Sequence, residues 1–375
     1  MTRPDRLIQI TVVFLAVGAA LAGNANGQTR STDRFLRVPS SAYPTIQSAI
    51  DAAPNGMKIV VAPGTYSETL LVQGKIVHIR GSEDPSQTTI AGDRPRGIVP
   101  ANAAVGLVNY KNGGGGTLYG FRLVGGDAGI TGRGLRGDRA AGREALRLDI
   151  RNVEISGSGR GILWDSPAAI VVSNSKISDT WGNGVSLLQG LLKSSYLTIV
   201  DAGQVGIYVA NADATFDNVV SGFNASAGFY IYKSHVFITD SSVFDNVVAG
   251  VWAVHSDLTA YGTSSYANKA NDVHRFGDGW VMLLSNANLD YCVGSANDRA
   301  GLSNFGGHVA LSNSEFSSNA FDLEGEDVPA NFFAFGDPAS DTDFSFSNGG
   351  NNTCDGDECT VATTSVEAPA PIVEP

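Results

Sequence analysis

The sequence predicts an all-β fold, a right-handed parallel β-helix (a solenoid) with a short N-terminal capping α-helix. A small residue followed by an apolar one recurs at a nearly constant spacing of 22 or 23 residues. The intervening residues have strand composition broken by polar turns. Such a period is typical of solenoids, whose coils bury their inner faces only against one another. The recurrences are Gly161-Ile162, Gly184-Val185, Gly206-Ile207, Gly228-Phe229, Gly250-Val251 and a weaker Asp272-Val273.

Alternation along each strand separates inward from outward side chains. With the apolar residue of each pair pointing inward, the next residue of each coil forms an outward column. A column of aromatic rings suits stacking against sugars, and an exposed apolar stripe usually contacts a partner. The alternative is that the rings only stabilise the sheet surface through cross-strand pairing. The predicted substrate-binding residues are Tyr208, Tyr230, Tyr232, Trp252 and His274.

The chain should form one secreted or periplasmic domain, which we expect to be monomeric. Residues 1–22 read as a signal peptide, with arginines ahead of an apolar run and Ala20-Leu21-Ala22 as the cleavage site. No later segment is apolar enough to predict a membrane span. Residues 23–42 should be a linker and first strand, 43–350 the β-helix, and 351–375 an acidic, Pro-containing tail.

The 375 residues carry a net charge of −12, and no Lys or Arg follows Arg299. Nucleic-acid binding needs basic patches, so this balance argues against a nucleic-acid partner. A polyanionic substrate would need a local Arg cluster or a bridging cation. The aromatic column makes a polysaccharide the expected partner.

Residues 43–54 should form the capping helix, because Pro44 stands near the start, Ile46 and Ile50 share one face, and Pro54 ends it. The segments TIQSAIDAAP (45–54), KIVVAPGTYSE (58–68) and HIRGS (78–82) resemble the opening of pectin-lyase-like parallel β-helix proteins, including pectin methylesterases. The resemblance implies the fold. It also implies that Gly64, Tyr66 and Glu68, which match the family's Gly-x-Tyr-x-Glu element, are structural.

The resemblance does not extend to catalytic motifs. The catalytic segments of the methylesterases, the polygalacturonase set and the Asp-Pro-His-Asp of alginate epimerases do not occur in this sequence. Whether the protein is an enzyme therefore stays open.

The weak catalytic candidates are Asp272, His274 and Arg275, because a carboxylate could orient an imidazole beside the bound sugar. The alternative interpretation is that Asp272 is a turn residue and His274 is one more ring in the column. No metal site is predicted with a complete ligand spacing. Ca²⁺ is a candidate cofactor through the acidic clusters Asp337/Asp341/Asp343 and Asp355/Asp357/Glu358, for which solvated turns are the alternative.

Cys354 and Cys359 are spaced for a small disulfide loop in an exported protein, and Cys292 should be a buried apolar residue.

The sequence thus favours a secreted protein that holds a polysaccharide along the aromatic column. Its chemistry, if it has any, would be of the lyase or epimerase type on uronic-acid polymers. The alternative is a non-catalytic extracellular structural or adhesive β-helix protein.

Overall fold

A computed structural model describes residues 35–93, 100–134, 147–271, 275–328 and 343–364, with the backbone of 333–334 and 337–338. The predicted signal peptide lies outside these residues, as do Asp272, His274 and residues 365–375. Among the helices of the described residues, none is long and apolar enough to cross a membrane.

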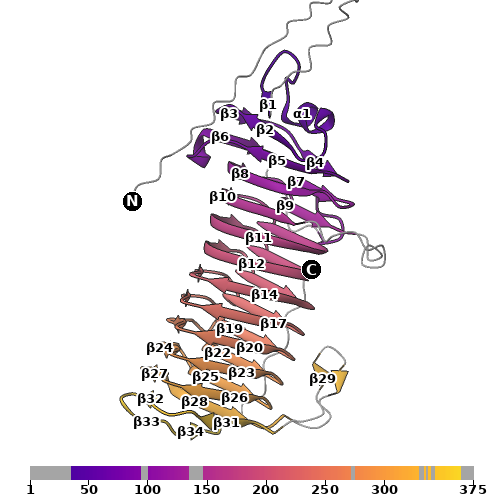
Figure 1. Ribbon diagram of the computed structural model, residues 1–375. Helices are drawn as coiled ribbons and strands as arrows, with labels where there is room; N and C mark the ends of the chain where they lie inside the picture. The colour runs from indigo at the N-terminus through magenta and orange to yellow at the C-terminus, as the bar shows by residue number, and fades with distance from the viewer. Residues whose placement is uncertain are drawn as a thin grey trace, which may run out of the picture. The chain divides into compact units, whose positions relative to one another are not determined.

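The described strands stack in register as a parallel β-helix, coil upon coil (Figure 1). Each regular coil contributes three short strands joined by tight corners. The coil from residue 207 to 228, for example, has β13 (Ile207–Ala210), β14 (Ala212–Asp217) and β15 (Val220–Gly222). This confirms the predicted fold class.

The first stack of strands carries the predicted aromatic column. Its members are β4 (Leu70–Gln73), β7 (Gly106–Lys111), β9 (Ala128–Arg133), the start of β11 (Ile162–Thr180) and of β12 (Val185–Ala202), β13, β16 (Phe229–Tyr232), β19 (Val248–Val254), β22 (Gly277–Leu283), β25 (Ala300–Phe305), β28 (Phe321–Glu326) and β34 (Val361–Ala362).

The second stack presents a polar face to solvent. Its members are β1 (Phe35–Val38), β2 (Met57–Val61), β5 (Ile76–Arg80), β8 (Gly115–Val124), β10 (Leu148–Ser156), the middle of β11 and β12, β14, β17 (His235–Thr239), β20 (Asp257–Tyr261), β23 (Asn286–Asp290), β26 (His308–Ser312) and β31 (Ser345–Asn348).

The third stack closes each coil. Its members are β3 (Gly64–Tyr66), β6 (Thr88–Ala91), the ends of β8, β10, β11 and β12, then β15, β18 (Ser242–Phe244), β21 (Ser264–Tyr266), β24 (Val293–Ser295), β27 (Glu315–Ser317) and β32 (Thr353–Cys354). The short antiparallel pairs β29–β30 (Phe333–Ala334, Asp337–Pro338) and β32–β33 (Asp357–Glu358) lie outside this pattern.

The capping helix α1 (Ile46–Ala52) is present, and it begins at Thr45, whose side chain accepts from the Ser48 N–H. Ile46 and Ile50 are buried against the end of the core. The Glu68 carboxylate accepts the N–H groups of Ile46 and Gln47, at 3.1 and 3.0 Å. The Glu of the Gly-x-Tyr-x-Glu element therefore satisfies free donors at the start of the helix, which is a structural role.

The strand pairing of the solenoid runs from β1 to β34, beyond the limits of 43 and 350 expected from the sequence. Cys354 and Cys359 form the expected disulfide at the β32–β33 turn. Cys292 is buried, and burial raises the pKa of its thiol to about 12.

Candidate functional site

The aromatic column forms as predicted on the outer side of the first stack. Tyr208 pairs with Tyr230, and Tyr230 with Trp252, in the strand register. The ring centroids of Tyr208 and Tyr230 lie 5.3 Å apart with planes 23° from parallel. Those of Tyr230 and Trp252 lie 5.2 Å apart, edge to face. The rings therefore contact one another in series across three coils.

The rings are buried, so the exposed stripe expected from the sequence is wrong for this conformation. Tyr208 is 5% exposed, Tyr230 0% and Trp252 2%. They belong to a second apolar cluster, separate from the main core and built from outward side chains. We call this surface the aromatic face; its other outward members include Tyr232, Val254, Val281, Leu283 and Phe305.

The indole N–H of Trp252 is buried without a hydrogen-bond acceptor among the described residues. A buried donor without a partner costs about 1–3 kcal/mol, and such donors are rare in native structures. A ligand that offered an oxygen here would satisfy it.

The next position of the column after Trp252 is Val281, not His274. In the register Val251 pairs with Trp280 and Trp252 with Val281, so this coil is seven residues longer than its neighbours. The assignment of Val273 as the start of a coil was therefore wrong, and His274 does not take the column position. Asp272 and His274 lie outside the described residues, and Arg275 is exposed just before β22.

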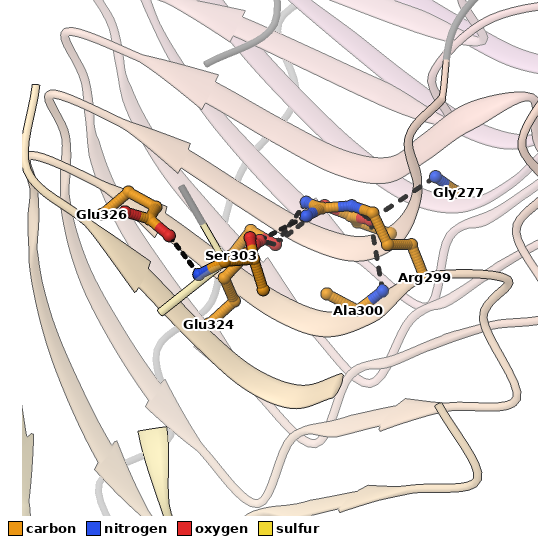
Figure 2. Close-up of polar contacts among 8 residues, drawn as sticks. Gly277, Arg299, Ala300, Ser303, Glu324 and Glu326 are labelled. Carbon is orange, nitrogen blue, oxygen red and sulfur yellow. Dashed lines mark hydrogen bonds and ion pairs between the residues drawn. The ribbon is translucent and has the colours of Figure 1, made fainter. Parts of the chain in front are cut away.

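An ionic cluster of Asp278, Arg299 and Glu324 adjoins the aromatic face, because Glu324 follows Val281 and Ser303 in the same column. Figure 2 shows the polar contacts around Arg299 and Glu324. The Arg299 guanidinium forms a bidentate ion pair with Asp278, its Nε lying 2.9 Å from Oδ1 and its Nη2 contacting Oδ2. Its Nη1 contacts Oε2 of Glu324. The Phe276 ring lies 4.4 Å from Arg299 Cζ, a cation–π contact. Asp278 and Glu324 are fully buried, and Arg299 nearly so.

The Ser303 hydroxyl links the two carboxyl groups of this cluster. Its Oγ lies 2.8 Å from Asp278 Oδ2 and 2.9 Å from Glu324 Oε2, and it accepts from Arg299 Nη2 at 2.8 Å. A hydroxyl has one proton and can donate to only one carboxylate.

Burial perturbs the carboxyl group of Asp278. Its complete burial raises its pKa above the ordinary range, although Arg299 and Ser303 act in the opposite direction. Arg299 pairs with both carboxyl groups, which lowers the cost of burying the cluster.

Sequence reasoning missed Arg299 and Glu324. Their partners lie 21 to 25 residues away. The repeat period could have located Glu324. Ser303 follows Val281 by 22 residues and Glu324 follows Ser303 by 21, which places both in the column of Trp252.

No metal centre is apparent in the described part of the chain, where no three His, Cys, Asp or Glu side chains gather. Asp355, Asp357 and Glu358 surround the disulfide turn and do not converge, while Asp337 and Asp341 have no described side chains.

A family model described as the right handed beta helix region matches residues 139–270. No curated protein matches the sequence. Among solved structures, a point mutant of the periplasmic alginate epimerase AlgG is 12% identical, with a TM-score of 0.57 and coverage of 83% of both chains. The unmutated AlgG structure gives 0.52 at 12% identity, covering 83% of this chain and 82% of that one.

The mannuronan C-5 epimerase AlgE4 A-module of Azotobacter vinelandii gives a TM-score of 0.50 at 12% identity, covering 86% of this chain and 95% of that one. Identities this low establish shared architecture only. The chain thus has the right-handed parallel β-helix fold.

Proposed function

We propose that this is a secreted protein that binds a polysaccharide along the aromatic face. The observation that carries the proposal is the continuous column of Tyr208, Tyr230 and Trp252, which runs in register into the cluster of Asp278, Arg299 and Glu324. Aromatic rings suit the apolar faces of sugar rings, and the unpaired Trp252 N–H suits a hydroxyl. Structural neighbours named as alginate epimerases support this substrate class.

The ionic cluster suits lyase- or epimerase-type chemistry on a uronic-acid polymer. Glu324 as carboxylate is the candidate base that takes the proton at C5, beside the substrate carboxylate. In elimination, the C5–H and C4–O bonds break, the C4–C5 double bond forms, and protonated Asp278 gives its proton to the departing oxygen. In epimerisation, the same acid returns a proton to C5. Arg299 is the candidate group that stabilises the charge developing on the substrate carboxylate.

Export rests on the N-terminal sequence and on the Cys354–Cys359 disulfide, because such bonds persist in oxidising compartments.

The test is a binding and activity comparison of the mature protein with Trp252→Ala and Phe237→Ala. Phe237 is an exposed ring on the polar face and is the matched control. Alginate, polygalacturonate and a neutral glucan would be assayed with and without Ca²⁺, and absorbance of unsaturated uronate would report elimination. We expect Trp252→Ala to weaken binding by about tenfold or more, the scale of a central aromatic contact, and Phe237→Ala to leave it unchanged. Equal binding by all three proteins would overturn the proposal.

A non-catalytic structural or adhesive rod is the second candidate. The burial of the rings and the pairing of Arg299 with Asp278 and Glu324 favour it, since neither the rings nor the guanidinium then need a substrate. Binding without product formation in the elimination and epimerisation assays would support a glycan-binding rod, and no binding to any polymer would leave the structural role.

A further inference from the structure

A group of aromatic rings lies on the third stack, apart from the aromatic face and from the polar face. Phe244 and Tyr266 are the last residues of β18 and β21, and they pair in the strand register. Their ring centroids lie 5.3 Å apart with planes 17° from parallel. The ring of Phe223, directly after β15, meets Phe244 edge to face, also at 5.3 Å. We call Phe223, Phe244 and Tyr266 the ring platform.

The ring platform is open to solvent, unlike the aromatic face. Phe223 is 54% exposed, and Phe244 and Tyr266 are half-buried. Val243 and Ser265, the residues just before Phe244 and Tyr266, are fully buried, so the two rings point outward. None of the three rings belongs to either apolar cluster of the protein. A contiguous group of exposed rings on a soluble protein usually marks a contact surface.

The backbone under the ring platform departs from what the fold favours at two positions. Phe223 has a φ of 57°, in the left-handed region, where a large side chain is strained. The same corner of the adjacent coils holds Asp201 and Asp245, at 56° and 51°, and Asp tolerates this conformation better. At Gly222 a Cβ would lie 2.8 Å from Phe244 Cε2, so the ring needs the glycine. Both departures bring rings together, and strained residues of this kind cluster at functional sites.

The charges around the ring platform indicate the class of ligand. Asp201 and Asp245 flank Phe223 at the corner, and Lys269 pairs with Asp245 at 2.8 Å. The Asp298 carboxylate accepts the N–H of Ala270, next to this lysine. The surroundings are therefore acidic on balance, which disfavours a uronic-acid polymer or another polyanion. Carboxylates accept hydrogen bonds from the hydroxyl groups of a neutral sugar, while aromatic rings suit the apolar faces of its ring.

The size of the ring platform also limits its occupant. A stable interface between two protein copies buries about 800 Å² on each partner. Aromatic side chains bury about 150–250 Å² each, so three half-accessible rings offer about 300 Å². This area is too small for a stable dimer, whereas a sugar chain can bind along a strip one ring wide.

We propose that the ring platform is a second carbohydrate-binding site, for a neutral polysaccharide whose sugar rings stack on its three aromatic rings. The site lies on a different stack from the aromatic face and does not depend on the function proposed there. Ser242 and Ser264, which pair in the register of β18 and β21, and the carboxylate of Asp245 are the candidate partners of the sugar hydroxyl groups.

The test is affinity electrophoresis of the mature protein through gels that each contain one polymer: soluble β-glucan, glucomannan, dextran or alginate. We expect at least one neutral polymer to retard the wild type. Phe223→Asn and Tyr266→Ala should each weaken this binding by about tenfold or more, the scale of a central aromatic contact. Phe237→Ala removes an exposed ring of the same coil as Phe244, on the polar face, and should be retarded like the wild type.

Phe223→Asn guards against misfolding as the cause of lost binding. Asn tolerates the left-handed conformation, so this variant removes a ring and relieves the strain at the corner. Its thermal midpoint should equal or exceed that of the wild type. Absence of retardation by every neutral polymer, or equal retardation of wild type, Phe223→Asn and Tyr266→Ala, would overturn the ring platform as a binding site.

Further outcomes separate this site from other occupants and from the aromatic face. Self-association in sedimentation velocity that Phe223→Asn abolishes would assign the ring platform to a second copy of the chain, against the proposal. Alginate binding that the same variant abolishes would contradict the neutral ligand. Neutral-polymer binding lost in Phe223→Asn supports the site even if alginate does not bind, which would contradict only the proposed function. Neutral-polymer binding lost in Trp252→Ala and kept in Phe223→Asn would contradict the ring platform and support the aromatic face.

Discussion

Asp278 is the side chain whose chemistry is most altered by its surroundings. It is fully buried, faces Arg299 and Ser303, and has a raised pKa because of its burial. The sequence showed it only as one acidic residue near the end of the regular repeat. Its partners come from the next two coils, and pairing at that distance becomes visible only once the register is known.

We predict that Asp278 makes the protein less stable as the pH rises above about 4. Between its ordinary pKa and the raised value, only the folded protein holds the proton, so the free energy of unfolding falls with pH. The slope for one proton is about 1.4 kcal/mol per pH unit. Asp278→Asn mimics the protonated acid and should remove this component, as measured by urea unfolding across a pH series.

The control for this measurement is Asp201→Asn, an exposed carboxyl at a left-handed position that Asn tolerates. It should retain the wild-type pH dependence. If wild type and Asp278→Asn differ by the same amount at every pH, then Asp278 does not hold the proton assigned to it.

At the scale of the structural element, a buried ladder of Asn side chains fixes the coil corner that follows the third stack. Each amide bonds to the next, with Nδ2 to Oδ1 distances of 2.7 to 3.2 Å. Each also accepts a backbone N–H of the previous coil. The ladder comprises Asn224, Asn246, Asn268, Asn297 and Asn319.

We predict that Asn246→Ala lowers the free energy of unfolding by about 3 kcal/mol, because it leaves the backbone N–H of buried Asn224 and one of its two side-chain amide hydrogens without an acceptor. Asn288→Ala, on the exposed polar face, should change it by no more than about 0.5 kcal/mol. Chemical denaturation measures both. Similar losses in the two variants would show that the ladder contributes nothing specific.

The position just before the ladder residue is left-handed in these coils, and an exposed Ala occupies it at residue 296 with φ 52°. A side chain with a Cβ is strained in this conformation, by about 1–2 kcal/mol. Ala296→Gly should therefore raise the free energy of unfolding, by about 0.5–1 kcal/mol after the entropy cost of Gly. A fall in thermal midpoint on this substitution would contradict the strain.

The regular period allowed the column of Tyr208, Tyr230 and Trp252 to be placed from the sequence, because each coil repeats the same corners. The same method failed at Val273, where the coil lengthens by seven residues and Trp280 takes the inward position. A repeat count cannot detect an insertion until the next coil has been identified. Gly279-Trp280 followed by Gly301-Leu302 restores the spacing of 22.

At the scale of the whole molecule, the two outer surfaces built by the same coils differ in kind. The second stack exposes charged and polar side chains such as Asp213, His235 and Asp257. The first stack buries a continuous apolar face that ends in a buried ionic cluster. Sequence alternation identified which side chains point outward, but it could not show which outward surface is covered.

The central claim is that a polysaccharide lies against Trp252. The most direct measurement is the emission of Trp252 during titration of Trp181→Phe protein with uronic-acid oligosaccharides, with Trp252→Phe in the same background as reference. We expect a saturable shift of emission in the first protein and no change in the reference. Oligosaccharide binding that left the Trp252 emission unchanged would show that the glycan lies elsewhere.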